Sequence, residues 1–180
     1  HAWLLSLSRR RHVLGDTLPG GAAVPVESVS LDPARIRLVF LLMMAGFAIE
    51  GLVLSSVLIH MVPLLTAIGL GTAGTLVATL FGPSQVASRL INMLFGGRLS
   101  QALLAVIATL LLALGLAVLL ASAPSLPGVA AFVILFGLGS GLVSIVGGTL
   151  PLEMFGRQGY GSRVGWMSAA RQFSSSFAPF

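Results

Sequence analysis

The sequence predicts an all-α membrane protein, a polytopic bundle of transmembrane helices. Of the 180 residues, 56% are hydrophobic and 8% are charged, whereas soluble domains carry about 25% charged residues. The mean hydropathy is +1.02. Apolar runs of the length that a spanning helix needs, about 20 residues, recur between shorter polar connectors. A soluble fold of this length could not bury so much apolar surface.

The apolar runs divide the chain into three parts. Residues 1–8 are typical of the tail of a preceding transmembrane helix. Residues 9–37 are polar and rich in proline and glycine, which predicts a long cytoplasmic loop. Residues 38–180 are predicted to form a helix bundle that stops within its fifth span, so we expect a longer parent protein. The predicted spans are 38–59, 73–95, 102–121, 129–150 and 164 onward.

The first span carries one carboxylate near its centre. Glu50 lies roughly 18 Å beyond Leu38 at 1.5 Å per residue, about halfway across a hydrocarbon core of about 30 Å. A charge at that depth costs about 2.5–3.5 kcal/mol, so Glu50 is expected to face protein or water. Two interpretations stay open: a group that gains and loses a proton, or a fixed partner of an arginine. Gly46 is expected to leave space beside it.

The second span places polar side chains on one helical face. Gly82-Pro83 precedes them and is expected to kink the helix. The pattern favours a cavity-lining face, with polar contacts between helices as the alternative. Structural and substrate roles are equally open for Arg89, which lies about two turns from the cytoplasmic end. The face consists of Gln85, Ser88, Arg89 and Asn92.

The third and fourth spans differ in their small and polar residues. Thr109 is the one polar side chain of 102–121, which predicts a lipid-facing helix. A stripe of small residues in the fourth span favours a packing seam over a flexible gating helix. Just beyond it, Glu153 and Arg157 have the spacing of a local salt bridge. The stripe consists of Gly137, Ser140, Gly141, Ser144 and Gly148.

The fifth span has an unusually polar face formed by Ser168, Arg171, Gln172 and Ser175. If the helix begins near Tyr160, Arg171 lies roughly 16 Å along it, close to the level of Glu50. Arginine keeps its charge in proteins. A cation at this depth must therefore meet a carboxylate, a group of carbonyls or an anionic substrate.

The arginines predict the orientation of the chain in the membrane. All ten basic residues are arginines, and eight of them lie on alternate connectors. The intervening connectors, 60–71 and 122–128, hold none. The positive-inside rule places the arginine-bearing side in the cytoplasm. We expect a multi-pass protein of the plasma membrane.

This organisation resembles the C-terminal half of a major facilitator superfamily (MFS) transporter. The stretch ASRLINMLFGGRLSQALL (87–104) is similar to the family's G-R-L-x-x-G-x-L-x-D-R turn, with Arg89 and Arg98 at its two arginines. Gly97 stands where the pattern has Asp. The stretch FGLGSGLVSIVGGTLPLEMFG (136–156) resembles the family's tenth helix. The resemblance implies that 1–8 ends helix 6, that 9–37 is the central loop, and that the five spans are helices 7–11.

The resemblance implies a secondary active transporter of a small solute, and Glu50 suggests protons as the coupling ion. Two intramembrane arginines against one glutamate favour an anion. We expect the lipid bilayer and the missing N-terminal half as partners, and no nucleic acid, cofactor or metal. The predicted substrate and coupling pathway consists of Glu50, Gln85, Arg89, Asn92, Ser168, Arg171 and Gln172.

Two other classes of function are alternatives to a transporter. A non-transporting membrane module, or an inactive transporter remnant, would need the same apolar helices without a working pathway. A membrane-embedded enzyme would need a nucleophile and base or a metal site. The chain has no cysteine and three histidines, His1, His12 and His60, and it contains neither G-x-S-x-G nor H-E-x-x-H. An enzyme is therefore not expected.

Overall fold

A computed structural model describes residues 33–96, 99–157 and 159–179. Among them the elements are all helical, as predicted, and three helices, α2, α5 and α6, are long and apolar enough to cross a membrane. The chain divides into the units 1–36 and 37–180, and the arrangement below is that of the second. The helices are α2 (Pro33–Ala67), α3 (Gly71–Ala78), α4 (Phe81–Phe95), α5 (Gln101–Ser122), α6 (Leu126–Phe155) and α7 (Tyr160–Ser175).

The first helix is longer at both ends than the predicted span 38–59. It begins at Pro33, so residues 33–37 are helical instead of part of the expected loop. It also continues through Pro63 to Ala67. Proline removes one backbone hydrogen bond, but Met61 and Leu65 on either side of it are buried in the main core, which favours continuing the helix. The predicted segment 1–8, residues 9–32 of the loop, and Arg98 lie outside the described residues.

The second predicted span is interrupted. Helix α3 ends at Ala78 and α4 begins at Phe81, so the kink expected at Gly82-Pro83 is a break about one turn earlier. Pro83 has no N–H to donate to the carbonyl of Thr79, four residues before it. At the break, the backbone N–H groups of Thr79 and Leu80 donate to carbonyls three residues earlier, those of Leu76 and Val77, at 3.2 and 3.0 Å, which is a tighter turn than an α-helix.

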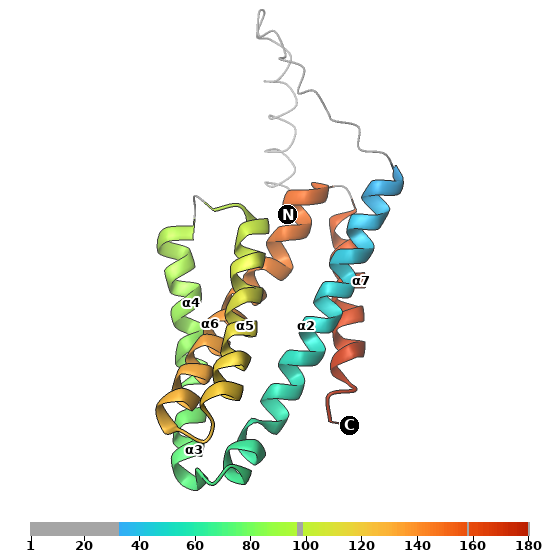
Figure 1. Cartoon of the computed structure of the whole chain (residues 1–180). Helices are drawn as coiled ribbons and strands as arrows, with labels where there is room; N and C mark the ends of the chain where they lie inside the picture. The colour runs from blue at the N-terminus through green and yellow to red at the C-terminus, as the bar shows by residue number, and fades with distance from the viewer. Residues whose placement is uncertain (1–32, 97–98, 158, 180) are drawn as a thin grey trace, which may run out of the picture. The chain divides into compact units, whose positions relative to one another are not determined.

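Helix α6 is the central helix of the unit, with α4 and α5 packed along it (Figure 1). Phe132, Val133 and Phe136 on α6 are fully buried. Every third or fourth residue of α5 is buried as well, from Leu104 to Leu119. The prediction of a lipid-facing third span therefore fits only the outer side of α5, because its small residues let one face pack closely on α6.

The α4–α6 contact is a tight seam of small residues. A Cβ atom at Gly137 would lie 2.8 Å from the carbonyl oxygen of Phe81, and one at Gly141 would overlap Ser88 Oγ and the carbonyl of Gln85. The amide Nε2 of Gln85 donates a hydrogen bond to Ser140 Oγ at 2.9 Å. The predicted packing seam is thus confirmed for the first part of the small-residue stripe of α6.

Contacts at the arginine-bearing end join α5, α6 and α7. Glu153 Oε2 accepts a hydrogen bond from the backbone N–H of Gln101 at 2.9 Å. The predicted ion pair of Glu153 with Arg157 is wrong, since no such contact occurs within the described part of the chain. The first amides of a helix lack partners inside the helix, so a carboxylate gains more at the start of α5. The Arg163 guanidinium lies 4.7 Å from the centre of the Phe155 ring.

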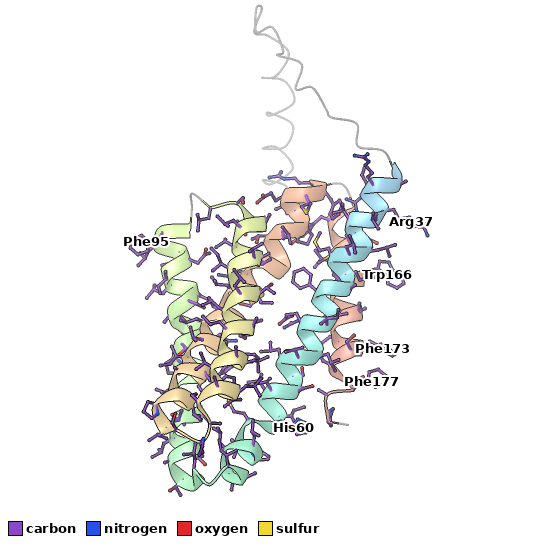
Figure 2. All side chains as sticks on the ribbon, viewed as in Figure 1. Arg37, His60, Phe95, Trp166, Phe173 and Phe177 are labelled. Carbon is purple, nitrogen blue, oxygen red and sulfur yellow. The ribbon has the colours of Figure 1, made fainter. Side chains whose placement is uncertain are left out.

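The helices alternate in direction. The ends of α4 and α6 and the starts of α5 and α7 lie on one side of the unit (Figure 1). Arg37 lies at that end of α2, and His60 lies toward the other (Figure 2). Arg157 and Arg163, which flank the α6–α7 turn, lie on the same side as Arg37. The helix directions therefore place Arg37, Arg157 and Arg163 on one side of the unit, as the sequence predicts.

Replacing Gly141 with alanine should destabilise the protein. The new Cβ meets backbone as well as the Ser88 hydroxyl, so one of the helices must move. Overpacking of this kind typically costs about 1–3 kcal/mol. Gly147→Ala on the same helix is the matched control, because its Cβ would lie at an ordinary 3.6 Å from Phe47. Thermal unfolding in detergent should show a lower Tm for Gly141→Ala alone; equal melting of both variants would contradict the seam.

The two ends of the bundle should be distinguishable by labelling from either side of the membrane. The chain has no native cysteine, so single reporters can be introduced. Ser125→Cys, at the start of α6, and Ser162→Cys, near the start of α7, are both exposed. In sealed cells an impermeant thiol reagent should label Ser125→Cys from outside and Ser162→Cys only after the membrane is opened. Labelling from the reverse sides would overturn the orientation.

Candidate functional site

The centre of the candidate site is an ion pair between α2 and α7. Arg171 Nε donates to Glu50 Oε2 at 2.8 Å, and Nη2 donates to Oε1 at 3.3 Å. Both oxygens of the carboxylate are thus held by one guanidinium, the strongest geometry for such a pair. The side chain of Glu50 is 13% exposed and that of Arg171 is 37% exposed. Of the two arginines within predicted spans, Arg171 is the partner of Glu50.

The pair can form because α2 and α7 approach closely at Gly51. A Cβ at Gly51 would lie 2.5 Å from Arg171 Cγ and 3.0 Å from Ser175 Oγ, so any larger residue would push the helices apart. Ser175 Oγ donates to the carbonyl of Arg171 at 2.9 Å, which keeps this hydroxyl on α7. Gly46, the glycine singled out in the sequence, has no atom within 4 Å of its Cβ position. Gly51 was not predicted as part of the site, although a small residue next to the carboxylate is a signal for close helix approach.

Two cavities adjoin the ion pair. The larger, of about 480 Å³, lies between α2, α5 and α6 and is bordered by Glu50. Glu50 is the one charged side chain among the described residues lining it. The smaller, of about 240 Å³, lies between α2, α6 and α7 and is bordered by Arg171. Phe47 and Val143 line both cavities, so the two are neighbours.

The smaller cavity has the more polar wall. Ser144, Ser168 and Arg171 line it, together with Gly147 and Gly148 on α6. Ser144 and Gly148 belong to the predicted small-residue stripe, so the stripe divides between the α4 seam and this cavity. Ser144 Oγ donates to the carbonyl of Gly141 at 2.6 Å, and its oxygen lone pairs remain able to accept hydrogen bonds.

The guanidinium of Arg171 has N–H donors that Glu50 does not use. A guanidinium offers five N–H donors, and Glu50 accepts two of them. The other three have no hydrogen bond to any residue that the structure describes. A cation with unused donors beside a cavity is chemically suited to bind an anion.

The predicted site residues of the second span lie elsewhere. Gln85 is hydrogen-bonded within the α4–α6 seam. Arg89 is exposed on α4 and makes no hydrogen bond or ion pair with a described residue. Asn92 packs against Gly96, and its buried Oδ1 has no partner among the residues described. The structure therefore brings Glu50 and Arg171 together with Ser168, and does not bring the α4 residues to them.

The outer face of α7 is aromatic and exposed. Trp166 and Phe173 on α7, and Phe177 just beyond its end, project to the side away from α5 and α6 (Figure 2), with exposed fractions of 65%, 69% and 55%. Gln172, another predicted site residue, is exposed and lines neither cavity. The face of α7 turned toward α6 carries Met167, which is buried, and Arg171. Only that inner face contributes to the site.

Comparison of the chain with protein-family models, with curated proteins and with solved structures finds no significant match.

Glu50→Gln should lower the stability of the protein, because it leaves the Arg171 charge without its carboxylate. Breaking a buried pair typically costs about 3–5 kcal/mol. Since Arg171 is 37% exposed, we expect a loss at or below about 3 kcal/mol. The double variant Glu50→Gln/Arg171→Gln should recover most of that loss. Thermal unfolding of the single and double variants measures both effects.

Glu153→Gln is the matched control for this experiment. Its amide oxygen can still accept the hydrogen bond from the Gln101 backbone, and the change leaves no cation in contact without its partner. Its melting temperature should stay close to that of the unaltered protein. If Arg171→Gln failed to rescue Glu50→Gln, the pair would not be the source of the destabilisation.

Proposed function

We propose that this protein is a secondary active transporter of the MFS type that moves a small anion together with a proton. The observation that carries the proposal is the Glu50–Arg171 pair, which joins two helices and borders two cavities. Intramembrane ionisable residues are costly, and they commonly mark substrate or proton pathways. The proposed setting is the plasma membrane, with the arginine-bearing ends in the cytoplasm.

Charge balance supplies the coupling in this proposal. With Glu50 ionised, its charge and that of Arg171 cancel. An anion entering the cavity beside Arg171 would then bring an excess negative charge into a medium that solvates charge poorly. Protonation of Glu50 removes this excess and frees the two donors that Glu50 holds. Anion and proton therefore favour each other's binding, and by linkage the effect is reciprocal.

The pair also supplies a two-state contact. An ionised Glu50 holds α7 against α2 through two hydrogen bonds. A protonated Glu50, with the anion on Arg171, would no longer fix the two helices by charge. A ligand shifts a conformational equilibrium only by its difference in affinity for the two states. Here that difference is the exchange of one anionic partner of Arg171 for another.

A static membrane module is the competing interpretation, in which the pair only fastens α2 to α7. The unused donors of Arg171 and the cavity beside them favour transport, because a fastening pair requires neither. The α4 residues Gln85, Ser88 and Asn92 fit a packing role and are not part of the proposed anion site. Arg89 likewise has no place in it.

Glu50→Gln should abolish proton-driven uptake while permitting exchange. Glutamine has nearly the volume of glutamate but cannot change charge, so it mimics the protonated state. In vesicles containing the full-length protein, an imposed proton gradient should drive anion uptake by the unaltered protein and not by the variant. Exchange of internal for external anion needs no proton release and should persist.

Arg171→Gln should lose both proton-driven uptake and exchange, because the anion then has no cation to bind. Arg89→Gln is the matched control and should retain both activities, since Arg89 contacts neither cavity. The amount of inserted protein is compared for each variant, so that loss of folding is not mistaken for loss of transport. Full gradient-driven uptake by Glu50→Gln would reject the coupling role.

A further inference from the structure

We infer that the transported anion is amphiphilic: an organic carboxylate whose head binds Arg171 and whose apolar body fills the larger cavity. The inference rests on the proposed function and adds the class of substrate to it. The two cavities differ in chemistry and adjoin each other at Phe47 and Val143. A ligand that spans both must therefore carry a polar group at one end and a hydrocarbon group at the other.

The smaller cavity suits the head group. Arg171 borders it with three donors that have no hydrogen bond to a described residue. Ser168 Oγ lines the same wall, and no described residue is hydrogen-bonded to it. A guanidinium binds a carboxylate with two parallel hydrogen bonds, which fixes its orientation. A head held in this way would direct the rest of the molecule past Phe47.

The larger cavity suits the body. Its volume of about 480 Å³ lies within the range of about 300–1,000 Å³ that is usual for small-molecule sites. Its wall is apolar apart from Glu50 and Thr109, and the Thr109 hydroxyl already donates to the carbonyl of Ala105 at 2.9 Å. A purely inorganic anion would leave this cavity unused, and a neutral apolar solute would leave Arg171 unused.

Reactivity of a cysteine at position 168 tests the inference. The full-length protein carrying Ser168→Cys is placed in phosphatidylcholine vesicles and treated with a small charged thiol reagent. Acetate, butanoate, hexanoate and octanoate are the competing probes. Each added methylene should lower the half-protecting concentration about fourfold. Octan-1-ol, which lacks the charge, should not protect, and Ser162→Cys on the same helix should be labelled equally with and without octanoate.

A cavity-filling variant separates binding in the cavity from partition into the bilayer, which also rises with chain length. Gly46 lines the larger cavity and has no atom within 4 Å of its Cβ position, so the Cβ of a leucine has open space and the rest of the side chain can extend into the cavity. Gly46→Leu should weaken protection by octanoate at least tenfold and leave protection by acetate unchanged. Gly82→Leu is the matched control, because Gly82 is equally unobstructed and borders neither cavity.

The inference would be overturned by protection independent of chain length, by equal protection by octan-1-ol, or by full protection by octanoate in Gly46→Leu. Phosphatidylglycerol in the vesicles, if it protected as well as octanoate, would assign the site to a lipid and also reject it. If a proton gradient drove uptake of acetate, and protection of Ser168→Cys did not depend on the chain length of the carboxylate, the proposed function would stand and this inference would be rejected. If protection depended on chain length but a proton gradient drove no uptake, the binding of an amphiphilic anion would stand and the proposed transport function would be rejected.

Discussion

The guanidinium of Arg171, toward the C-terminal end of α7, is neutralised by Glu50 on α2. Because arginine keeps its charge in proteins, its neutralisation here requires a carboxylate, which comes from another helix. That requirement accounts for several local features at once. Gly51 gives the arginine stem room against α2, and Ser175 turns its hydroxyl onto α7 itself. The cavities on either side of the pair follow from holding α2 and α7 together there while α6 remains beside them.

The unit combines two kinds of helix contact. Helices α4, α5 and α6 meet through glycines and small residues, and the Gln85–Ser140 hydrogen bond lies within that seam. Close packing of this kind resists small displacements. The α2–α7 contact depends instead on a pair of charges, whose strength changes with protonation. A stable group of three helices beside a pair that responds to charge is the arrangement on which the proposed coupling rests.

In the proposed mechanism the solute lies between these two groups, and its two ends have separate roles. The charged end would compete with Glu50 for Arg171, which would link binding to proton uptake. The apolar end would gain free energy from leaving water, in proportion to the area buried. Charge would therefore supply the coupling, and the buried hydrocarbon area would set the affinity. An amphiphilic anion engages both, whereas a simple ion or a neutral solute engages one.

The all-helical fold and the presence of helices long and apolar enough to span a membrane followed from the sequence alone, as did the choice of Glu50 and Arg171 as candidate site residues. Hydropathy and the cost of a charge in hydrocarbon are properties of single residues and short segments. Which arginine faces Glu50 did not follow, because Arg89 and Arg171 both lie within predicted spans and carry the same charge, and the sequence does not fix which helices are neighbours. Only the packing of helices far apart in the chain placed Arg171 against Gly51 and left Arg89 exposed on α4. The continuation of α2 through Pro63 and the division of the α6 stripe between seam and cavity were likewise decided by tertiary contacts. In both cases neighbouring helices determined which side chains were buried, and a short stretch of sequence does not show which helices will be its neighbours.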